Sequence, residues 1–167
     1  HCVLPLYHVS GFMQLARALL TMGKIVYGRL EAFAANHAFL SDERRENRFL
    51  SLVSTQLGRL VEDERAHAPL REYGAIFVGG GPAPVGLLER CRALRLPLAP
   101  TYGMTETAAQ VATLLPSAFL AGESSQGRAL PHVALGIVSE EDPSRACERG
   151  VAGRIRVAGS SLFRGYY

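Results

Sequence analysis

Residues 75–101 constrain the fold more than any other part of the chain. Residues 75–78 form a short apolar run, and the turn 79–82 that follows at once contains three glycines and a proline. Residues 84–95 then combine a proline in the first turn with apolar side chains at helical spacing, which is typical of a helix. Residues 98–101 form the next apolar run. This order of strand, helix and strand predicts a parallel βαβ unit.

The same alternation extends over the chain up to residue 115. Apolar side chains recur at helical spacing from Phe12 to Leu20, and Gly23 follows as a stop signal. Ser54 or Thr55 can cap a later helix. The fold class is therefore predicted as α/β, built from parallel βαβ units. The expected strands are residues 3–6, 24–27, 49–53, 75–78 and 98–101; the expected helices are residues 12–21, 32–40, 54–66 and 84–95, with a connector at residues 69–73.

The composition and the hydrophobic pattern of the sequence change after residue 115. Glycine and proline become frequent, and residues 133–138 and 154–158 alternate or run apolar over strand lengths. We therefore expect two portions, an α/β portion over residues 1–115 and a β-rich portion over residues 116–167.

The composition excludes several classes of protein. The chain has 167 residues, 48% of them hydrophobic and 20% charged, which suits a globular domain with a core. The net charge is only +3, and arginines are scattered among acids, as in residues 41–46, so we expect no nucleic-acid partner. The most apolar stretch, residues 12–26, is interrupted by polar and charged side chains, so we expect no membrane span. Three widely spaced cysteines favour a reducing compartment, and we expect a cytoplasmic protein.

Residues 101–107 carry the side chains with the clearest chemistry. Tyr102 can offer a flat face to a base, and Gly103 allows close approach of the backbone to a ligand. Thr105 can donate a hydrogen bond to a phosphate oxygen, and Glu106 is a hard oxygen ligand of the kind that Mg²⁺ takes together with substrate phosphates. Any one of these residues alone is typical of a polar turn. Together they favour a nucleotide site.

This string resembles the signature of the adenylate-forming superfamily, which includes acyl-CoA synthetases, firefly luciferase and the adenylation domains of peptide synthetases. Those enzymes use ATP to convert a carboxylate to an acyl-adenylate and usually pass the acyl group to coenzyme A. The resemblance implies that Tyr102 stacks on adenine. It also implies catalytic roles for Thr105, which would touch the adenylate phosphate, and for Glu106, which would bind the metal, Mg²⁺.

The glycine turn supports the same resemblance. It lacks the Lys-Ser/Thr ending of a phosphate P-loop and the spacing of a dinucleotide fingerprint. It precedes Tyr102 by about one βαβ unit, where the superfamily has a loop that borders adenine and the acyl group. The resemblance thus implies these nucleotide-binding residues: Gly79, Gly80, Gly81, Pro82, Thr101, Tyr102, Gly103 and Met104.

The acid substrate is expected to lie near two other segments. His8 follows a predicted strand and resembles the histidine of the superfamily element before the acyl pocket; by itself such a histidine is more often structural. Ser10 and Gln110 are the further substrate-binding candidates. Gln110 is expected to face the site if a helical turn continues past Thr105. Thr113 is a further candidate that an extended continuation would turn elsewhere.

Within the superfamily, four segments resemble the o-succinylbenzoate–CoA ligases of menaquinone and phylloquinone biosynthesis: residues 4–11, 51–57, 102–113 and 126–130. Residues 153–159 and 165–167 resemble a further, largely structural element, with Arg154 where an acidic residue is usual. The free carboxylate of such an acid needs hydrogen-bond donors. The candidates are Ser10, Arg59, Gln110, Ser125 and Arg128.

The superfamily's upstream phosphate loop and its C-terminal domain with a catalytic lysine have no counterpart in this sequence. We therefore expect a fragment of a larger ligase, inactive alone, whose parent uses a small carboxylic acid, ATP and coenzyme A. Self-association through uncovered apolar surface is also expected. Two alternatives stay open: another acyl- or aryl-CoA synthetase of the superfamily, and a non-catalytic nucleotide-binding domain.

Overall fold

The computed structural model describes residues 1–30 and 47–167. Its main feature is a five-stranded sheet with the order β1-β2-β3-β4-β5. The first three strands are parallel, and β4 and β5 continue the sheet antiparallel, so the sheet is mixed. The parallel units confirm the predicted α/β class. The strands are β1 Phe49–Val53, β2 Ala75–Gly79, β3 Leu98–Met104, β4 Ala109–Thr113 and β5 Arg128–Ala129.

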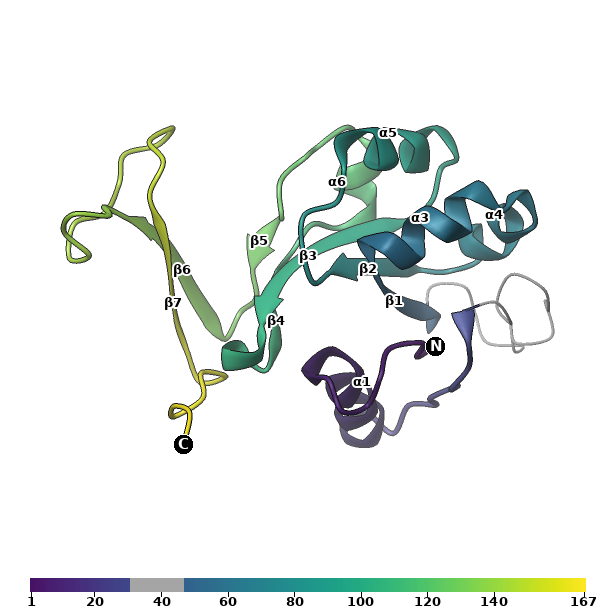
Figure 1. Ribbon diagram of the computed structural model, residues 1–167, viewed down its shortest axis with the longest axis horizontal. Helices are drawn as coiled ribbons and strands as arrows, with labels where there is room; N and C mark the ends of the chain where they lie inside the picture. The colour runs from purple at the N-terminus through teal and green to yellow at the C-terminus, as the bar shows by residue number, and fades with distance from the viewer. Residues whose placement is uncertain (31–46) are drawn as a thin grey trace.

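Helices cover the two faces of this sheet unequally. Helices α3 to α6 lie together on one face, and α1 lies on the other side (Figure 1). Neighbouring parallel strands joined by right-handed crossovers place their connecting helices on the same face, as α3, α4 and α5 do here. The helices are α1 Val9–Leu20, α3 Ser54–Glu62, α4 Glu64–Arg71, α5 Val85–Ala93 and α6 Pro116–Leu120.

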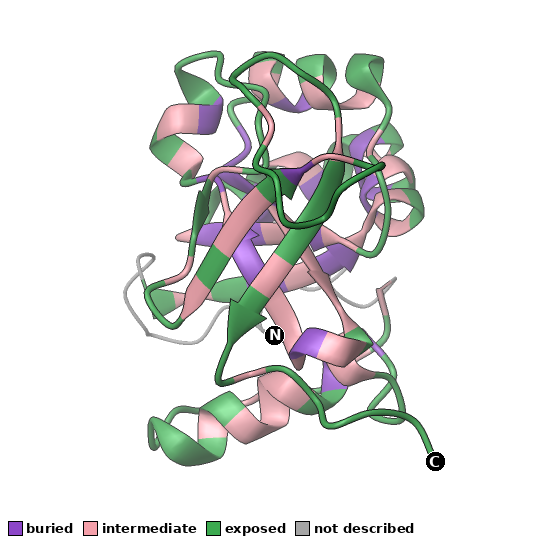
Figure 2. Ribbon diagram, turned by 90° about the vertical axis from the view of Figure 1, so that its left-hand side faces the viewer, coloured by how far each residue is buried: buried purple, intermediate pink, exposed green. Residues whose placement is uncertain are grey.

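The hydrophobic core lies between the sheet and helices α3 to α6 (Figure 2). Alternate residues of β1 and β2 point into it, namely Leu50 and Leu52 in β1 and Ile76 and Val78 in β2, as the period of two in a strand requires. The fully buried side chains include Leu50 in β1, Ile76 in β2 and Leu98 in β3. Phe119 of α6 is also fully buried, so this short helix closes one end of the core.

A second, two-stranded sheet stands to one side (Figure 1). Strands β6 (Val133–Val138) and β7 (Arg154–Gly159) pair antiparallel along their whole length. Both strands were expected in the β-rich portion and are confirmed. Helix α6, by contrast, was not predicted, and α6 and β5 contact the first sheet although they follow residue 115. The division of the chain at residue 115 stays a prediction.

Two predicted strands are wrong. Instead of strands at residues 3–6 and 24–27, the structure has isolated bridges that join Cys2 to Tyr27 and to Ser51. The amide of Cys2 donates to the Val26 carbonyl at 2.9 Å. Proline has no amide hydrogen, so Pro5 cannot extend this pairing into a ladder.

The helix predicted at residues 54–66 is interrupted. Asp63 has an extended backbone and separates α3 from α4, and its carboxylate caps α4 by accepting from the Arg65 amide at 3.1 Å. The expected connector at residues 69–73 is also wrong, because α4 continues through Pro69 to Arg71. The helix expected at residues 32–40 lies outside the described residues.

No helix in the described part of the chain is long and apolar enough to span a bilayer. Cys2 and Cys91 are buried and Cys147 is half-buried, and none of the three is in a disulfide. Burial raises the pKa of the Cys91 thiol to about 12, so this thiol stays protonated near neutral pH.

Candidate functional site

The glycine turn and the Thr101–Thr107 segment lie next to each other at one edge of the sheet. Strands β2 and β3 are parallel neighbours, with Val78 opposite Pro100. The turn begins where β2 ends at Gly79, and the hydroxyl of Thr101 donates to the Val78 carbonyl at 3.2 Å. The expectation that the two segments are adjacent is confirmed. In open sheets the crevice at the carboxyl ends of parallel strands is the usual ligand site.

The turn itself needs glycine for a backbone reason. Gly80 has φ +79°, and Gly81 and Pro82 follow it across the end of β2. This left-handed conformation is rare for residues with a side chain. Glycine at this position also lets the backbone of the turn approach a ligand closely.

Strand β3 continues further than the sequence indicated. It was expected to end at Thr101, but it runs through Tyr102 and Gly103 to Met104. A bulge between Tyr102 and Gly103 shifts the register with β4. A Cβ on Gly103 would clash with the Ala109 carbonyl oxygen, so only glycine allows β4 to pack this closely. Bulges commonly redirect a side chain beside an active site.

The residues after Met104 form a tight turn and then reverse direction. Thr105–Thr107 is a single 3₁₀ turn, and Ala108 and Ala109, the first residue of β4, have φ +52° and +81°. Two consecutive alanines with positive φ store backbone strain, which is common at functional sites. The reversal leaves Thr105 exposed and Glu106 half-buried at the tip.

Thr107 fastens this turn and is a structural residue to which the sequence analysis gave no role. Its side chain is 1% exposed. Its hydroxyl accepts from the Met104 amide at 3.1 Å and lies 2.8 Å from the Ala109 carbonyl oxygen, to which it can donate. The signal in the sequence was a threonine three residues after Met104, a spacing at which side chains often bond the local backbone.

Glu106 is held in its ionised form. Its own backbone amide and then the Tyr166 hydroxyl, which donates to Oε1 at 2.8 Å, lower the pKa of the carboxyl. No group of three or more histidine, cysteine or acidic side chains forms a metal site within residues 1–30 and 47–167. A single carboxylate still fits Mg²⁺, which usually keeps several waters and binds one or two carboxylates plus phosphate oxygens.

The substrate-binding candidates lie on and beside α1. His8 is the N-cap of α1, and its Nδ1 accepts from the Ser10 amide at 3.3 Å and lies 2.8 Å from the Ser10 hydroxyl oxygen. Helix α1 contacts β4, the strand that carries Gln110. The Gln110 side-chain amide donates to the Thr113 hydroxyl, so these two residues are neighbours on an extended strand. Helix α1 and the strand that carries Gln110 are thus in contact. The chain makes one 3₁₀ turn at Thr105–Thr107 and then extends as β4, so the helical continuation considered for Gln110 and Thr113 is wrong.

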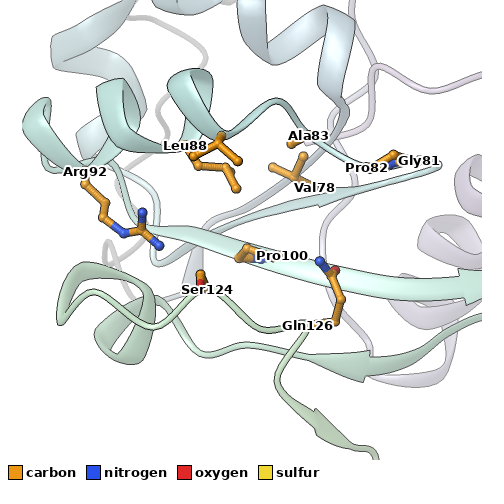
Figure 3. Close-up of a pocket in the computed structure, with 10 residues that line it drawn as sticks. Val78, Gly81, Pro82, Ala83, Leu88, Arg92, Pro100, Ser124 and Gln126 are labelled. Atoms are coloured by element: carbon orange, nitrogen blue, oxygen red, sulfur yellow. The ribbon is translucent and has the colours of Figure 1, made fainter. Parts of the chain in front are cut away.

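A cavity of about 280 Å³ opens beside the glycine turn (Figure 3). Gly81 and Pro82 line one side, and Pro100, which directly precedes the Thr101–Thr107 segment, lines another. The volume is at the lower end for a ligand pocket, so the cavity suits one ring system rather than a whole nucleotide. The sequence analysis missed the remaining lining residues, which include Leu88, Arg92, Ser124 and Gln126.

Arg92 joins this cavity to α6. Its guanidinium donates to the carbonyls of Phe119 at 2.9 Å and Glu123 at 2.7 Å, and it lies 4.4 Å above the centre of the Phe119 ring. These contacts fix the segment that carries Ser124 and Gln126 over the sheet. Nothing in the local pattern around residue 92 indicates this role, because its partners lie about 30 residues further along the chain.

Comparisons with known proteins agree with this arrangement. The chain is 35% identical to 2-succinylbenzoate–CoA ligase of Bacillus licheniformis, over 98% of the chain and 33% of that protein. It resembles o-succinylbenzoate coenzyme A synthetase of Bacillus subtilis in complex with AMP, with a TM-score of 0.79 and 31% identity over 99% of the chain and 33% of the solved one. The same enzyme in complex with ATP and a magnesium ion gives a TM-score of 0.77 at 31% identity, over 98% of the chain and 33% of the solved one.

The chain thus spans about a third of the length of the relatives it matches. The family profile described as AMP-binding enzyme matches residues 1–167, which is the entire sequence. On this match and these relatives, the chain belongs to the family of AMP-binding enzymes.

Proposed function

We propose that the chain is the nucleotide- and acid-binding part of an AMP-forming carboxylate–CoA ligase. The parent protein would convert an acid, ATP and coenzyme A to acyl-CoA, AMP and pyrophosphate through an acyl-adenylate. The observation that carries the proposal is the adjacency of the glycine turn and the Thr101–Thr107 segment at the ends of β2 and β3. Membership of the AMP-binding family and the AMP and ATP complexes of the similar ligase support it.

The nucleotide would lie across these two segments. Adenine would occupy the cavity side of the glycine turn and stack on Tyr102, and the exposed hydroxyl of Thr105 would donate to the α-phosphate. Glu106 would hold Mg²⁺, which offsets negative charge on the phosphoryl oxygens when it is bound. The lowered pKa of Glu106 keeps the carboxylate ionised for this purpose.

The acid would approach from the α1 side of the sheet. Its carboxylate oxygen attacks the α-phosphorus, the bond to the bridging oxygen of pyrophosphate breaks, and pyrophosphate leaves. The thiol of coenzyme A then attacks the acyl carbon, and AMP departs. His8, Ser10 and Gln110 would line the acid site, because α1 and β4 are in contact. We propose o-succinylbenzoate as the acid, on the strength of the similarity to 2-succinylbenzoate–CoA ligases.

The test is a ligase assay on the full-length parent protein. With o-succinylbenzoate, ATP, Mg²⁺ and coenzyme A, we expect thioester and AMP in equal amounts, and a loss of about 100-fold or more in Glu106→Ala. A panel of fatty, benzoic and cinnamic acids is the comparison for the substrate. A better rate with one of these acids would reassign the substrate and keep the reaction. Nucleotide binding without any acid-dependent release of pyrophosphate would instead identify a non-catalytic nucleotide-binding domain.

The isolated 167-residue chain is proposed to be inactive and to self-associate. The chain spans about a third of the length of the ligases it matches. On α1 and just after it, Leu19, Leu20 and Met22 are 70%, 84% and 94% exposed, which is unusual apolar exposure for a monomer. Light scattering after size exclusion would measure the association. A cytoplasmic location is proposed from the absence of disulfides among the three cysteines.

A further inference from the structure

The segment after β7 returns to the tip that carries Glu106. In Figure 1 the C-terminal segment passes beside the turn between β3 and β4. The amide of Phe163 donates to the Glu106 carbonyl at 2.9 Å, and the hydroxyl of Tyr166 donates to Glu106 Oε1 at 2.8 Å. The C-terminal segment thus bonds both the main chain and the side chain of Glu106. Tyr166 and Glu106 are 60 residues apart in the sequence.

The Tyr166 hydroxyl is itself held in place. Its ring packs edge-on against the Phe163 ring, with centroids 4.8 Å apart and an interplanar angle of 77°. The Phe163 amide is in turn bonded to Glu106, so the ring pair and the two hydrogen bonds form a closed loop of contacts. A half-buried carboxylate at the tip of a turn otherwise samples several rotamers, and a fixed donor restricts them.

We propose that Tyr166 is a positioning residue that orients the Glu106 carboxylate for Mg²⁺, an inference that rests on the function proposed above. A carboxylate has two oxygens with about four lone-pair sites, so the bond from the Tyr166 hydroxyl at Oε1 and the bond from the Glu106 backbone amide still leave lone pairs for the cation. A phenol is well suited to this task because it donates a hydrogen bond without adding positive charge. A lysine or arginine at the same place would neutralise the carboxylate and compete with the metal.

Two neighbouring tyrosines give a matched pair of variants. Tyr166→Phe removes only the hydroxyl and keeps the ring beside Phe163, while Tyr167→Phe makes the same change on an exposed side chain at the next position. In the full-length protein, Tyr166→Phe should raise the Mg²⁺ concentration for half-maximal rate and lower kcat, each about threefold to tenfold, which is the effect of one hydrogen bond. The KM for the acid should stay unchanged. Tyr167→Phe should match the wild type, and thermal melting of both variants should match as well.

A binding measurement separates this proposal from the ligase assignment. Mn²⁺ replaces Mg²⁺, and electron paramagnetic resonance counts free Mn²⁺ in the presence of ATP without any turnover. Tyr166→Phe should bind Mn²⁺–ATP about threefold to tenfold more weakly than the wild type and Tyr167→Phe. Equal binding in all three proteins would overturn the role of Tyr166 even where the wild type is an active ligase. If the wild type produces no AMP, the proposed function fails, and the Mn²⁺ measurement alone still decides the role of Tyr166.

Discussion

The two sheets in the described part of the chain differ in how deeply their apolar side chains are buried. In the five-stranded sheet, Leu50, Ile76 and Leu98 are almost fully buried under helices that the same segments supply. In the β6–β7 sheet, Ile137 and Ile155 are 42% and 46% exposed, and Val138 is the residue with a fully buried side chain among those strands. A two-stranded sheet of this kind is marginal by itself in water.

This difference suggests that the part of the chain that stabilises the fold is not the only part that contributes residues to the candidate site. The first sheet supplies the rigid edge on which the glycine turn and the Thr101–Thr107 segment lie. The second sheet contributes little core, yet the segment after it returns to Glu106. We infer that the β6–β7 sheet and the segment after it serve mainly to place side chains such as Tyr166 beside Glu106. The five-stranded sheet and its helices determine whether the chain folds.

Truncating one isoleucine in each sheet tests this difference most directly. Ile76→Ala in β2 should lower the free energy of unfolding by about 2–5 kcal/mol, because it leaves a cavity in a fully buried position. Ile155→Ala in β7 makes the same change at a half-exposed position and should cost about 1 kcal/mol or less. Urea titrations followed by circular dichroism measure both. Equal losses would show that the two sheets unfold as one unit with a shared core.

Substitutions at two threonines of one turn separate an effect on stability from an effect on activity. Thr107→Val should cost about 1–3 kcal/mol of stability, because the Met104 amide loses its acceptor in a buried place. Thr105→Val is the matched control at an exposed position and should change stability by about 0.5 kcal/mol or less. In the full-length protein, Thr105→Val should instead lower kcat. A stability loss at Thr105 as large as that at Thr107 would contradict the division of roles.

The smallest expected effect concerns two aspartates, one in each region. The Arg65 side chain lowers the pKa of Asp63 at the start of α4, and the Ser144 hydroxyl and amide lower that of Asp142 in the β6–β7 loop. A pKa below its unfolded value stabilises the fold above about pH 4, and this contribution is lost as the pH falls through the folded-state pKa.

We therefore expect Asp63→Ala to lower the thermal midpoint slightly at pH 7, and this difference from the wild type to vanish as the pH falls through the folded-state pKa, below which the carboxyl is protonated in both states. Asp142→Ala should leave the midpoint of the first sheet unchanged over the same pH range, since its loop can open locally. A pH-independent loss in Asp63→Ala would assign the effect to packing rather than to the charge.

The sequence predicted the strands and helices whose signals are local. Residues 49–53 and 133–138 match β1 and β6, and the turn after residue 78 was recognised from its glycines. Helix α6 was missed because its five residues are short and its burial depends on Phe119 reaching a core built by distant segments. The break at Asp63 was missed because buried apolar residues lie on both sides of it, Val61 in α3 and Ala66 in α4, and the pattern resembles one continuous helix.

The sequence allowed the residues of the candidate site to be predicted, but not the long-range contacts that orient them. Tyr102, Thr105 and Glu106 could be singled out by their chemistry, and a parallel βαβ unit predicted that the glycine turn lies beside them. The contact of Tyr166 with Glu106 joins residues 60 positions apart through a segment without regular structure. No periodicity or spacing encodes such a contact, and the same holds for Arg92 over Phe119.

The most direct test is a crystal structure of the full-length protein with AMP and Mg²⁺. The account predicts adenine against the backbone of Gly80 and Gly81 and stacked on Tyr102, with the phosphate near Thr105 and the metal on Glu106. AMP bound at another face of the sheet, with no contact to the glycine turn or to Tyr102, would contradict it.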